Sequence, residues 1–217
     1  MTQDASAGAD ARATLAARCL SIDLEVSRES GRLFAFAAVR GDTEQSLVFR
    51  GQWHLPEALD KLDAFSEGCD FVLGHNAIAF DIPILAAARP SLALLRVPVL
   101  DTLRLNPLAF PRNPYHRLVK HYRDGGFNRW RRNDPELDAR LALELLKQQQ
   151  RAFASLQASA PALPEIWHGL LGAGDVAVDS LFTELRDAPR PMEQALASTL
   201  ATFLAGRACS VRASSRP

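Results

Sequence analysis

Cysteine is scarce in this sequence, and its placement excludes two common kinds of site. The 217 residues contain three cysteines, Cys19, Cys69 and Cys209, and no two of them have the C-x-x-C spacing of a zinc site or a redox motif. Cysteines that are few, odd in number and far apart indicate a reducing setting. We therefore expect a cytoplasmic protein.

Long apolar runs and an excess of charge are also absent. No segment approaches the roughly 18 uninterrupted apolar residues of a membrane span, and the first residues contain acids and no apolar run of signal-peptide length. We therefore expect a soluble protein with no membrane partner. Lys and Arg total 25, as do Asp and Glu, so only the local distribution of charge is informative.

The sequence does have the composition of an ordinary globular domain. Hydrophobic residues make up 47% and charged residues 23% of the chain, whose length suits one domain with extra helices. We expect a disordered N-terminus at 1–16 and a folded domain at 17–150. The Ala- and Leu-rich residues 151–217 predict a helical extension with a frayed tail.

Hydrophobic periodicity predicts the fold class. Apolar and polar residues alternate over residues 17–26, as in a β-strand with one buried face, and this places Asp23 and Glu25 on the same side. The elements expected next are strands at 33–39 and 46–49, a helix at 55–65, a strand at 71–74, a helix at 82–88, a strand at 97–100, and helices at 134–156, 164–171, 176–185 and 192–204. This order predicts an α/β fold with a mixed β-sheet, three antiparallel strands followed by parallel ones, flanked by helices.

The pair Asp23 and Glu25 is the first candidate site. Two carboxylates at positions i and i+2 on one strand face lie close enough to share a cation, and Mg²⁺ and Mn²⁺ prefer such hard oxygen ligands. The alternative is a polar strand face that simply contacts water. The pair alone favours that alternative.

A second group of candidates lies in G-H-N-A-I-A-F-D, where an apolar strand ends and a helix begins. Asp81 can serve a site there, or it can cap the helix through backbone N–H groups. His75 and Asn76 can contact a ligand, or they can hold a loop through side-chain hydrogen bonds. For each residue taken singly, the structural role is favoured.

The third candidate is Asp138, in the segment N-D-P-E-L-D-A-R. Asp134 and Pro135 are a favourable start of a helix, so Asp138 falls in its second turn. From there it can project from a fixed backbone. The alternative is a solvated acid near the positively polarised end of the helix.

Together these segments resemble the ordered signature of the DnaQ-like 3′-5′ exonuclease superfamily: D-x-E on the first strand, H-N-x-x-F-D between a strand and a helix, and D-A-x-x-A in the last long helix. The resemblance covers residues 17–150. It includes V-L-D-T-L at 99–103, similar to a strand-edge segment of the family, and residues 115–122, similar to a short helix that precedes the last motif. The segment NDPELDARLALELL is also similar to exonuclease domains fused to RecQ-type helicases, which implies a helicase domain or partner.

The resemblance implies a ribonuclease-H-like fold and an activity. Asp23, Glu25, Asp81 and Asp138 would converge on two Mg²⁺ or Mn²⁺ ions about 4 Å apart, which generate hydroxide from water and stabilise the leaving 3′ oxygen. Glu25 would also lie near the terminal 3′ hydroxyl. The implied reaction is 3′-5′ hydrolysis of single-stranded nucleic acid, with DNA favoured over RNA.

One catalytic position departs from the family pattern. Its members carry a His five residues before the final Asp, or a Tyr four residues before it, and this chain has Asn133 and Asp134 there. Asn133 can hydrogen-bond a water molecule but does not titrate near neutral pH, whereas general-base assistance contributes roughly 10²–10⁴ in rate. His116, His121 and Tyr122 lie upstream, and only a loop folding back would bring one of them to the site.

A basic stretch with interleaved aromatic residues precedes the third motif. Phosphate contact and base stacking favour this composition, so we assign nucleic-acid contacts to Arg117, Lys120, Arg129, Arg131 and Arg132. The alternative is a solvated loop around Gly125 and Gly126. The resemblance adds contacts to nucleic acid from His75, Asn76 and Phe80.

Two functional hypotheses follow. The first is an active, metal-dependent 3′-5′ exonuclease. The second is a degenerate exonuclease fold that binds a nucleic-acid end or a protein with weak or no cleavage, and it is motivated by Asn133. Four acids in register argue for the first, because like charges close together are destabilising unless a cation joins them.

Overall fold

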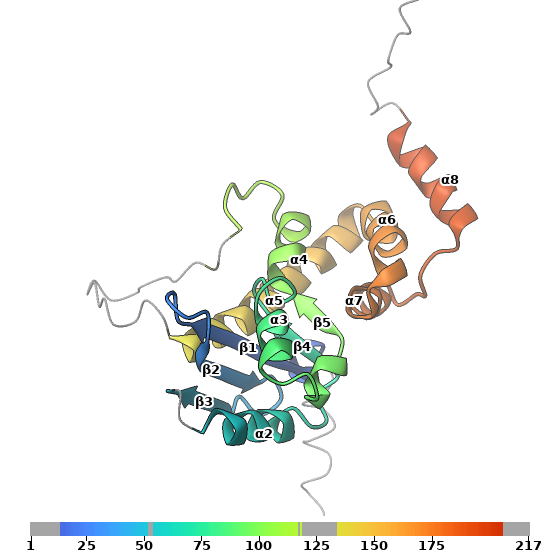
Figure 1. The fold of residues 1–217 in the computed structure, drawn as a ribbon. Helices are drawn as coiled ribbons and strands as arrows, with labels where there is room; N and C mark the ends of the chain where they lie inside the picture. Colours follow the sequence, from blue (N-terminus) through green and yellow to red (C-terminus); the bar gives the residue numbers. More distant parts are fainter. Residues whose placement is uncertain (1–13, 52–53, 117, 119–133, 206–217) are drawn as a thin grey trace, which may run out of the picture. The chain divides into compact units, whose positions relative to one another are not determined.

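The computed structural model describes residues 14–51, 54–116, 118 and 134–205 (Figure 1). It divides into two compact units, Met1–Ala152 and Phe153–Pro217. The long helix α5 (Pro135–Ser159) crosses that boundary, so it contributes to both units.

The first unit is built on one five-stranded mixed β-sheet (Figure 1). Its strands are β1 (Cys19–Val26), β2 (Leu33–Arg40), β3 (Ser46–Arg50), β4 (Phe71–Gly74) and β5 (Val99–Asp101). The order across the sheet is β3-β2-β1-β4-β5; β2 is antiparallel to β1 and β3, whereas β4 is parallel to β1 and to β5. The predicted α/β fold with a mixed sheet is therefore confirmed, and β1 is its central strand.

Helices flank this sheet on both faces (Figure 1). The helical elements of the first unit, besides the start of α5, are η1 (Ala16–Arg18), α2 (Leu55–Phe65), α3 (Asp81–Ala88), η2 (Ala93–Arg96) and α4 (Thr102–Ala109). On one face, Leu20, Ile22 and Leu24 of β1 belong to a hydrophobic core shared with α2 and α3. On the other face, β1 contacts α5 through Ser21, which is fully buried.

The burial of Cys19 and Ser21 corrects one sequence prediction. Both residues have 0% of their surface exposed, although the alternating pattern predicts a single buried face. The pattern is misleading because α5 covers the polar side of β1 and Ser21 satisfies its hydroxyl on the helix backbone. Only the C-terminal end of that face, at Asp23 and Glu25, stays half-buried.

The helix α4 has no counterpart among the sequence predictions. Pro107 lies inside this helix, and a proline in the sequence normally argues against the interior of a helix. Asp101 caps this helix by accepting a hydrogen bond from the backbone N–H of Leu103 at 3.0 Å. The short helix expected at 115–122 is absent at Tyr115, His116 and Leu118, and the remainder of that stretch lies outside the described residues.

The second unit is helical. After the end of α5 it contains α6 (Ala162–Leu171), η4 (Gly172–Gly174), α7 (Val176–Arg186) and α8 (Glu193–Leu204). Its core is aromatic: Phe153 lies 5.6 Å from Phe182 and 6.2 Å from Trp167 between ring centroids. Among the described residues of the whole chain, no helix has both the length and the apolar character needed to cross a bilayer.

A buried histidine joins α6 to α7 in this second unit. The Arg186 guanidinium lies 2.7 Å from His168 Nδ1, and a guanidinium can only donate, so Nδ1 accepts and Nε2 carries the proton. Nε2 lies 3.1 Å from Asp179 Oδ1. Burial lowers the pKa of His168, which opposes the effect of Asp179, so the ring is neutral at neutral pH and stabilises the helix pair as a polar bridge.

Candidate metal centre

Three of the predicted acids come together on the α5 side of the sheet. Asp23 and Glu25 lie on β1 and Asp138 lies in α5, and one carboxylate oxygen of each lies within 4.8 Å of the other two. All three residues are half-buried. We call Asp23, Glu25 and Asp138 the acidic triad. Its donor set, made only of carboxylate oxygens, fits a hard divalent cation such as Mg²⁺ or Mn²⁺.

A buried hydrogen bond sets the position of α5 against β1. Ser21 Oγ donates to the backbone oxygen of Ala139 at 2.8 Å. Ser21 is two residues before Asp23 on the same strand face, and Ala139 follows Asp138 directly. This contact helps to align the two halves of the acidic triad, and the sequence pattern did not indicate it.

The first turn of α5 is also tied to strand β3. Ser46 Oγ donates to Glu136 Oε1 at 2.8 Å, and the Arg50 guanidinium pairs with Asp134 Oδ1 at 3.0 Å. Asp134 is the residue at the position for which the sequence resemblance implies a Tyr. Its carboxylate is engaged with Arg50, so Asp134 acts in anchoring the helix and is not placed among the triad.

Asp81 is buried, with 3% of its surface exposed, and does not belong to the group within 4.8 Å. It is the first residue of α3, and its Oδ1 accepts a hydrogen bond from the backbone N–H of Leu24 at 2.9 Å. Strand β4 pairs with β1 only over Cys19–Ser21, so Leu24 lies beyond the last pair. Asp81 satisfies this strand N–H, and its carboxylate lies beside the backbone that links Asp23 to Glu25.

Burial raises the pKa of Asp81 to about 7. Hydrogen bonds from the backbone N–H groups of Leu24 and of Asp81 itself oppose this effect, whereas the nearby charges of Asp101 and Glu25 add to it. Asp81 therefore changes its charge near neutral pH. A divalent cation close by would favour the ionised form.

The segment between β4 and α3 carries the other predicted contacts. A Cβ on Gly74 would lie 2.7 Å from the Cβ of Ala77 and 3.2 Å from the backbone oxygen of Ile22, so only glycine fits this close return of the chain. Asn76 has a left-handed backbone, with φ of 74°. His75 Nδ1 lies 2.9 Å from Thr102 Oγ1, whose hydroxyl donates to the backbone oxygen of Gly74.

His75 and Phe80 differ in what they can offer a ligand. Burial lowers the pKa of His75, which outweighs the opposing effects of Asp101, the His116 backbone and Asp138, so the ring is neutral at neutral pH. Phe80 has 38% of its surface exposed and directly precedes Asp81. An exposed aromatic ring is a suitable surface for base stacking.

Six of the predicted site residues cannot be placed against this geometry. They lie outside the described residues: Arg117, Lys120, Arg129, Arg131, Arg132 and Asn133. The assignment of the basic stretch to nucleic-acid contact, and of Asn133 to the catalytic position, stays a prediction.

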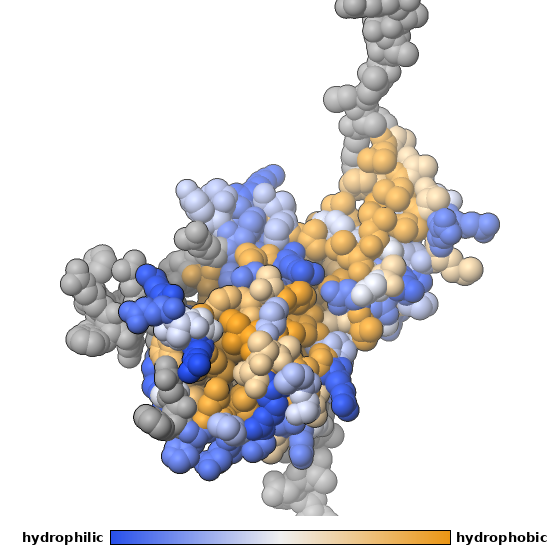
Figure 2. All heavy atoms as spheres, in the orientation of Figure 1, coloured by the Kyte–Doolittle hydropathy of each residue, from blue (hydrophilic) through white to orange (hydrophobic). Residues whose placement is uncertain are grey.

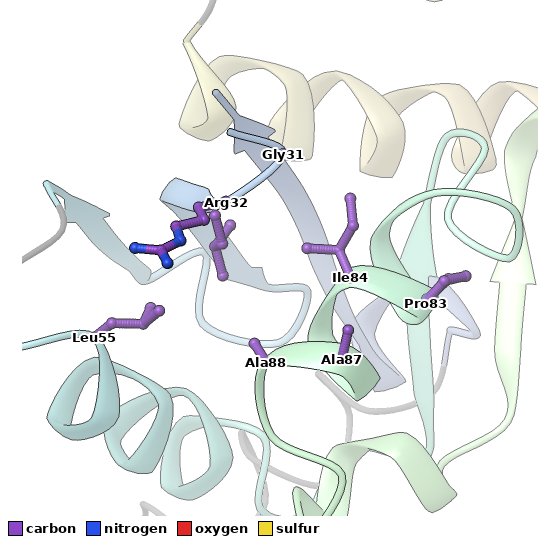
Figure 3. Close-up of a pocket in the computed structure, with 8 residues that line it drawn as sticks. Gly31, Arg32, Leu55, Pro83, Ile84, Ala87 and Ala88 are labelled. Carbon is purple, nitrogen blue, oxygen red and sulfur yellow. The ribbon is translucent and has the colours of Figure 1, made fainter. Parts of the chain in front are cut away.

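A mostly apolar cleft of about 510 Å³ opens in the first unit (Figure 3). Figure 3 shows Ile84 and Ala88 of α3 facing Arg32 and Leu55 across it. Hydrophobic residues are visible at the surface between α2 and α3 in Figure 2. No triad residue lines the cleft, but its wall residue Leu33 pairs with Val26, which follows Glu25 on β1. The cleft therefore lies on the face of the sheet that α2 and α3 cover, opposite the face that carries the acidic triad.

Comparison of the chain with protein-family models, curated proteins and solved structures gave no match. Function is therefore inferred from the chemistry of the site.

Proposed function

We propose that this chain is a metal-dependent 3′-5′ exonuclease of the DnaQ-like kind, with a ribonuclease-H-like fold. Its substrate is the 3′ end of single-stranded nucleic acid, DNA in preference to RNA. The acidic triad carries the proposal: acids from β1 and α5, far apart in the chain, have carboxylate oxygens within 4.8 Å. The position of Asp23 and Glu25 on the central strand of a mixed sheet supports it.

The residues of the site suit this chemistry. The acidic triad would hold Mg²⁺ or Mn²⁺, which supply a Lewis acid for the scissile phosphate and lower the pKa of a bound water. Asp81 adds a carboxylate that ionises near neutral pH beside the triad. Phe80 offers an exposed ring for the terminal base. A RecQ-type helicase domain or partner remains part of the proposal on sequence similarity alone.

The test is incubation of the purified chain with single strands labelled at the 3′ or the 5′ end, with Mg²⁺ or Mn²⁺, beside an Asp23→Ala variant. We expect mononucleotides to be released from the 3′ end by the wild type and not by the variant. Equal inertness of both proteins with either metal, on DNA and on RNA, would mean that the chain is not an exonuclease.

A second candidate function is a nucleic-acid-end binding module with weak or no cleavage. It is favoured by Asn133, which occupies the position of the family's general base. Replacing Asn133 by His restores a group that titrates near neutral pH, so we expect the rate of 3′ release to rise by about 10²-fold if water activation is limiting.

The same variant series separates the two functions. Tight binding of a 3′-ended strand without release, by the wild type and by Asn133→His alike, supports the binding module. Release by the wild type that does not increase in Asn133→His shows that the general base is not limiting.

A further inference from the structure

One carboxylate from another part of the chain, that of Asp101, accepts hydrogen bonds from the loop between β4 and α3. Asp101, at the end of β5, has 4% of its surface exposed and accepts three backbone hydrogen bonds. Its Oδ1 accepts from the N–H of Asn76 at 2.8 Å and of Leu103 at 3.0 Å, and its Oδ2 accepts from the N–H of Ile78 at 3.2 Å.

Only one of these three bonds is explained by helix capping. The bond to Leu103 caps α4, whereas the bonds to Asn76 and Ile78 reach a loop far earlier in the chain. The bond from the Asn76 N–H also holds that residue in its left-handed conformation, which asparagine adopts more readily than most residues other than glycine.

The neighbouring Thr102 adds a second tie to the same loop. Its hydroxyl donates to Gly74 and lies 2.9 Å from His75 Nδ1. Gln149 of α5 donates from Nε2 to the backbone oxygen of Thr102 at 2.8 Å. The end of β5 is thus linked to α5, the helix that carries Asp138, and the loop takes its position from that anchored point.

We propose that Asp101 is a positioning residue, which fixes the backbone of the 75–80 loop and thereby presents the exposed Phe80 to the 3′ end of a nucleic acid. This assignment rests on the proposed exonuclease function. Asp101 contacts neither the substrate nor the metal in this role. It acts through the loop, and its loss weakens the binding of substrate while the acidic triad keeps its ion.

The test uses Asp101→Ser, because serine is a good helix cap but is too short to reach the loop, so α4 keeps its cap. We expect the KM for a 3′-ended single strand to rise about tenfold with a kcat change below about threefold, as two hydrogen bonds are lost. Binding of Mn²⁺ alone, measured by titration, should be unchanged. Amide hydrogen exchange at residues 75–80 should become faster.

The matched control is Asp63→Ser. Asp63 is likewise a carboxylate that accepts two backbone hydrogen bonds, from Ala93 and Leu94 at 3.0 Å each, but it holds η2 and not the 75–80 loop. The Asp63→Ser variant should leave the KM unchanged.

A second variant, Asp101→Asn, can be measured if the serine variant does not fold. Its amide oxygen can keep the bonds to Asn76 and Leu103, so it should give an intermediate KM. In a Phe80→Ala background, Asp101→Ser should add less to the KM than it does in the wild type.

Two outcomes overturn the proposal in different ways. If the wild type binds and cleaves the strand but the KM and the loop exchange of Asp101→Ser match those of Asp63→Ser, Asp101 is not a positioning residue. If the wild type neither binds nor cleaves any 3′-ended strand, the proposed function fails and the role of Asp101 in it fails too.

Discussion

Replacing Asp138 by Asn is expected to lower metal-dependent 3′ release by about 10³-fold or more. Asn keeps the shape of the side chain but removes one of the three carboxylates whose oxygens lie within 4.8 Å. Metal ions contribute several kcal/mol of charge stabilisation to phosphoryl transfer, and each 1.36 kcal/mol is a factor of ten in rate. Losing one ligand charge should therefore affect the rate far more than the fold.

The direct measurement is thermal unfolding with and without Mg²⁺ or Mn²⁺. A ligand that binds only the folded state raises Tm by mass action, so the wild type should gain Tm on metal addition and Asp138→Asn should gain little or none. The matched control is Asp134→Asn, one turn earlier in the chain. Its carboxylate pairs with Arg50 and not with the triad, so it should keep the full metal response and lose at most about 1 kcal/mol of stability.

An Asp138→Asn variant with a wild-type metal response would show that the triad is not the metal centre. A variant with no metal response and undiminished nuclease activity would show that the activity belongs elsewhere. The Asp134→Asn control distinguishes these results from a general loosening of α5, because it removes only the ion pair that anchors the start of α5 to β3.

The positions of the strands along the chain were accessible from the sequence because apolar residues mark β1, β2, β3 and β4. Leu20, Ile22 and Leu24 alternate with polar residues, and short apolar runs bounded by turn residues mark the neighbouring strands. The alternation does not reveal what covers the polar side. Ser21 and Asp23 look equivalent in the sequence, but α5 buries the first completely and leaves the second half-buried.

The contacts that hold the site together were not accessible from the sequence, because they are long-range and involve ordinary residue types. In the sequence Asp101 is an ordinary acid at the end of a short strand. Its hydrogen bond from Asn76 forms only because β5 pairs with β4 in the folded chain. Asp134 illustrates the reverse case. Its local pattern correctly marks the helix start, but its ion pair with Arg50 depends on where β3 lies.

Ionisation of Asp81 makes the stability of the folded chain depend on pH, and replacing Asp81 by a neutral residue should remove this dependence. Its pKa is raised to about 7, chiefly by burial, from an unfolded value near 4. For an acid whose folded pKa is raised, the unfolded chain releases the proton first as pH increases, so stability is lost between about pH 4 and pH 7. Above pH 7 the loss is complete, and below pH 4 it is absent.

Asp81→Asn should therefore be more stable than the metal-free wild type at pH 8, by about 2–3 kcal/mol beyond any difference at pH 5. The measurement is urea unfolding at both pH values in the presence of a chelator. Asp70→Asn, which removes an exposed acid paired with Arg18, should show no such pH-dependent gain. In the proposed function Asp81 supplies a fourth carboxylate beside the triad, so the same Asp81→Asn variant should also lose nuclease activity. An Asp81→Asn variant with wild-type stability at both pH values would mean that Asp81 is not a buried titrating group, and an undiminished activity would remove it from the site.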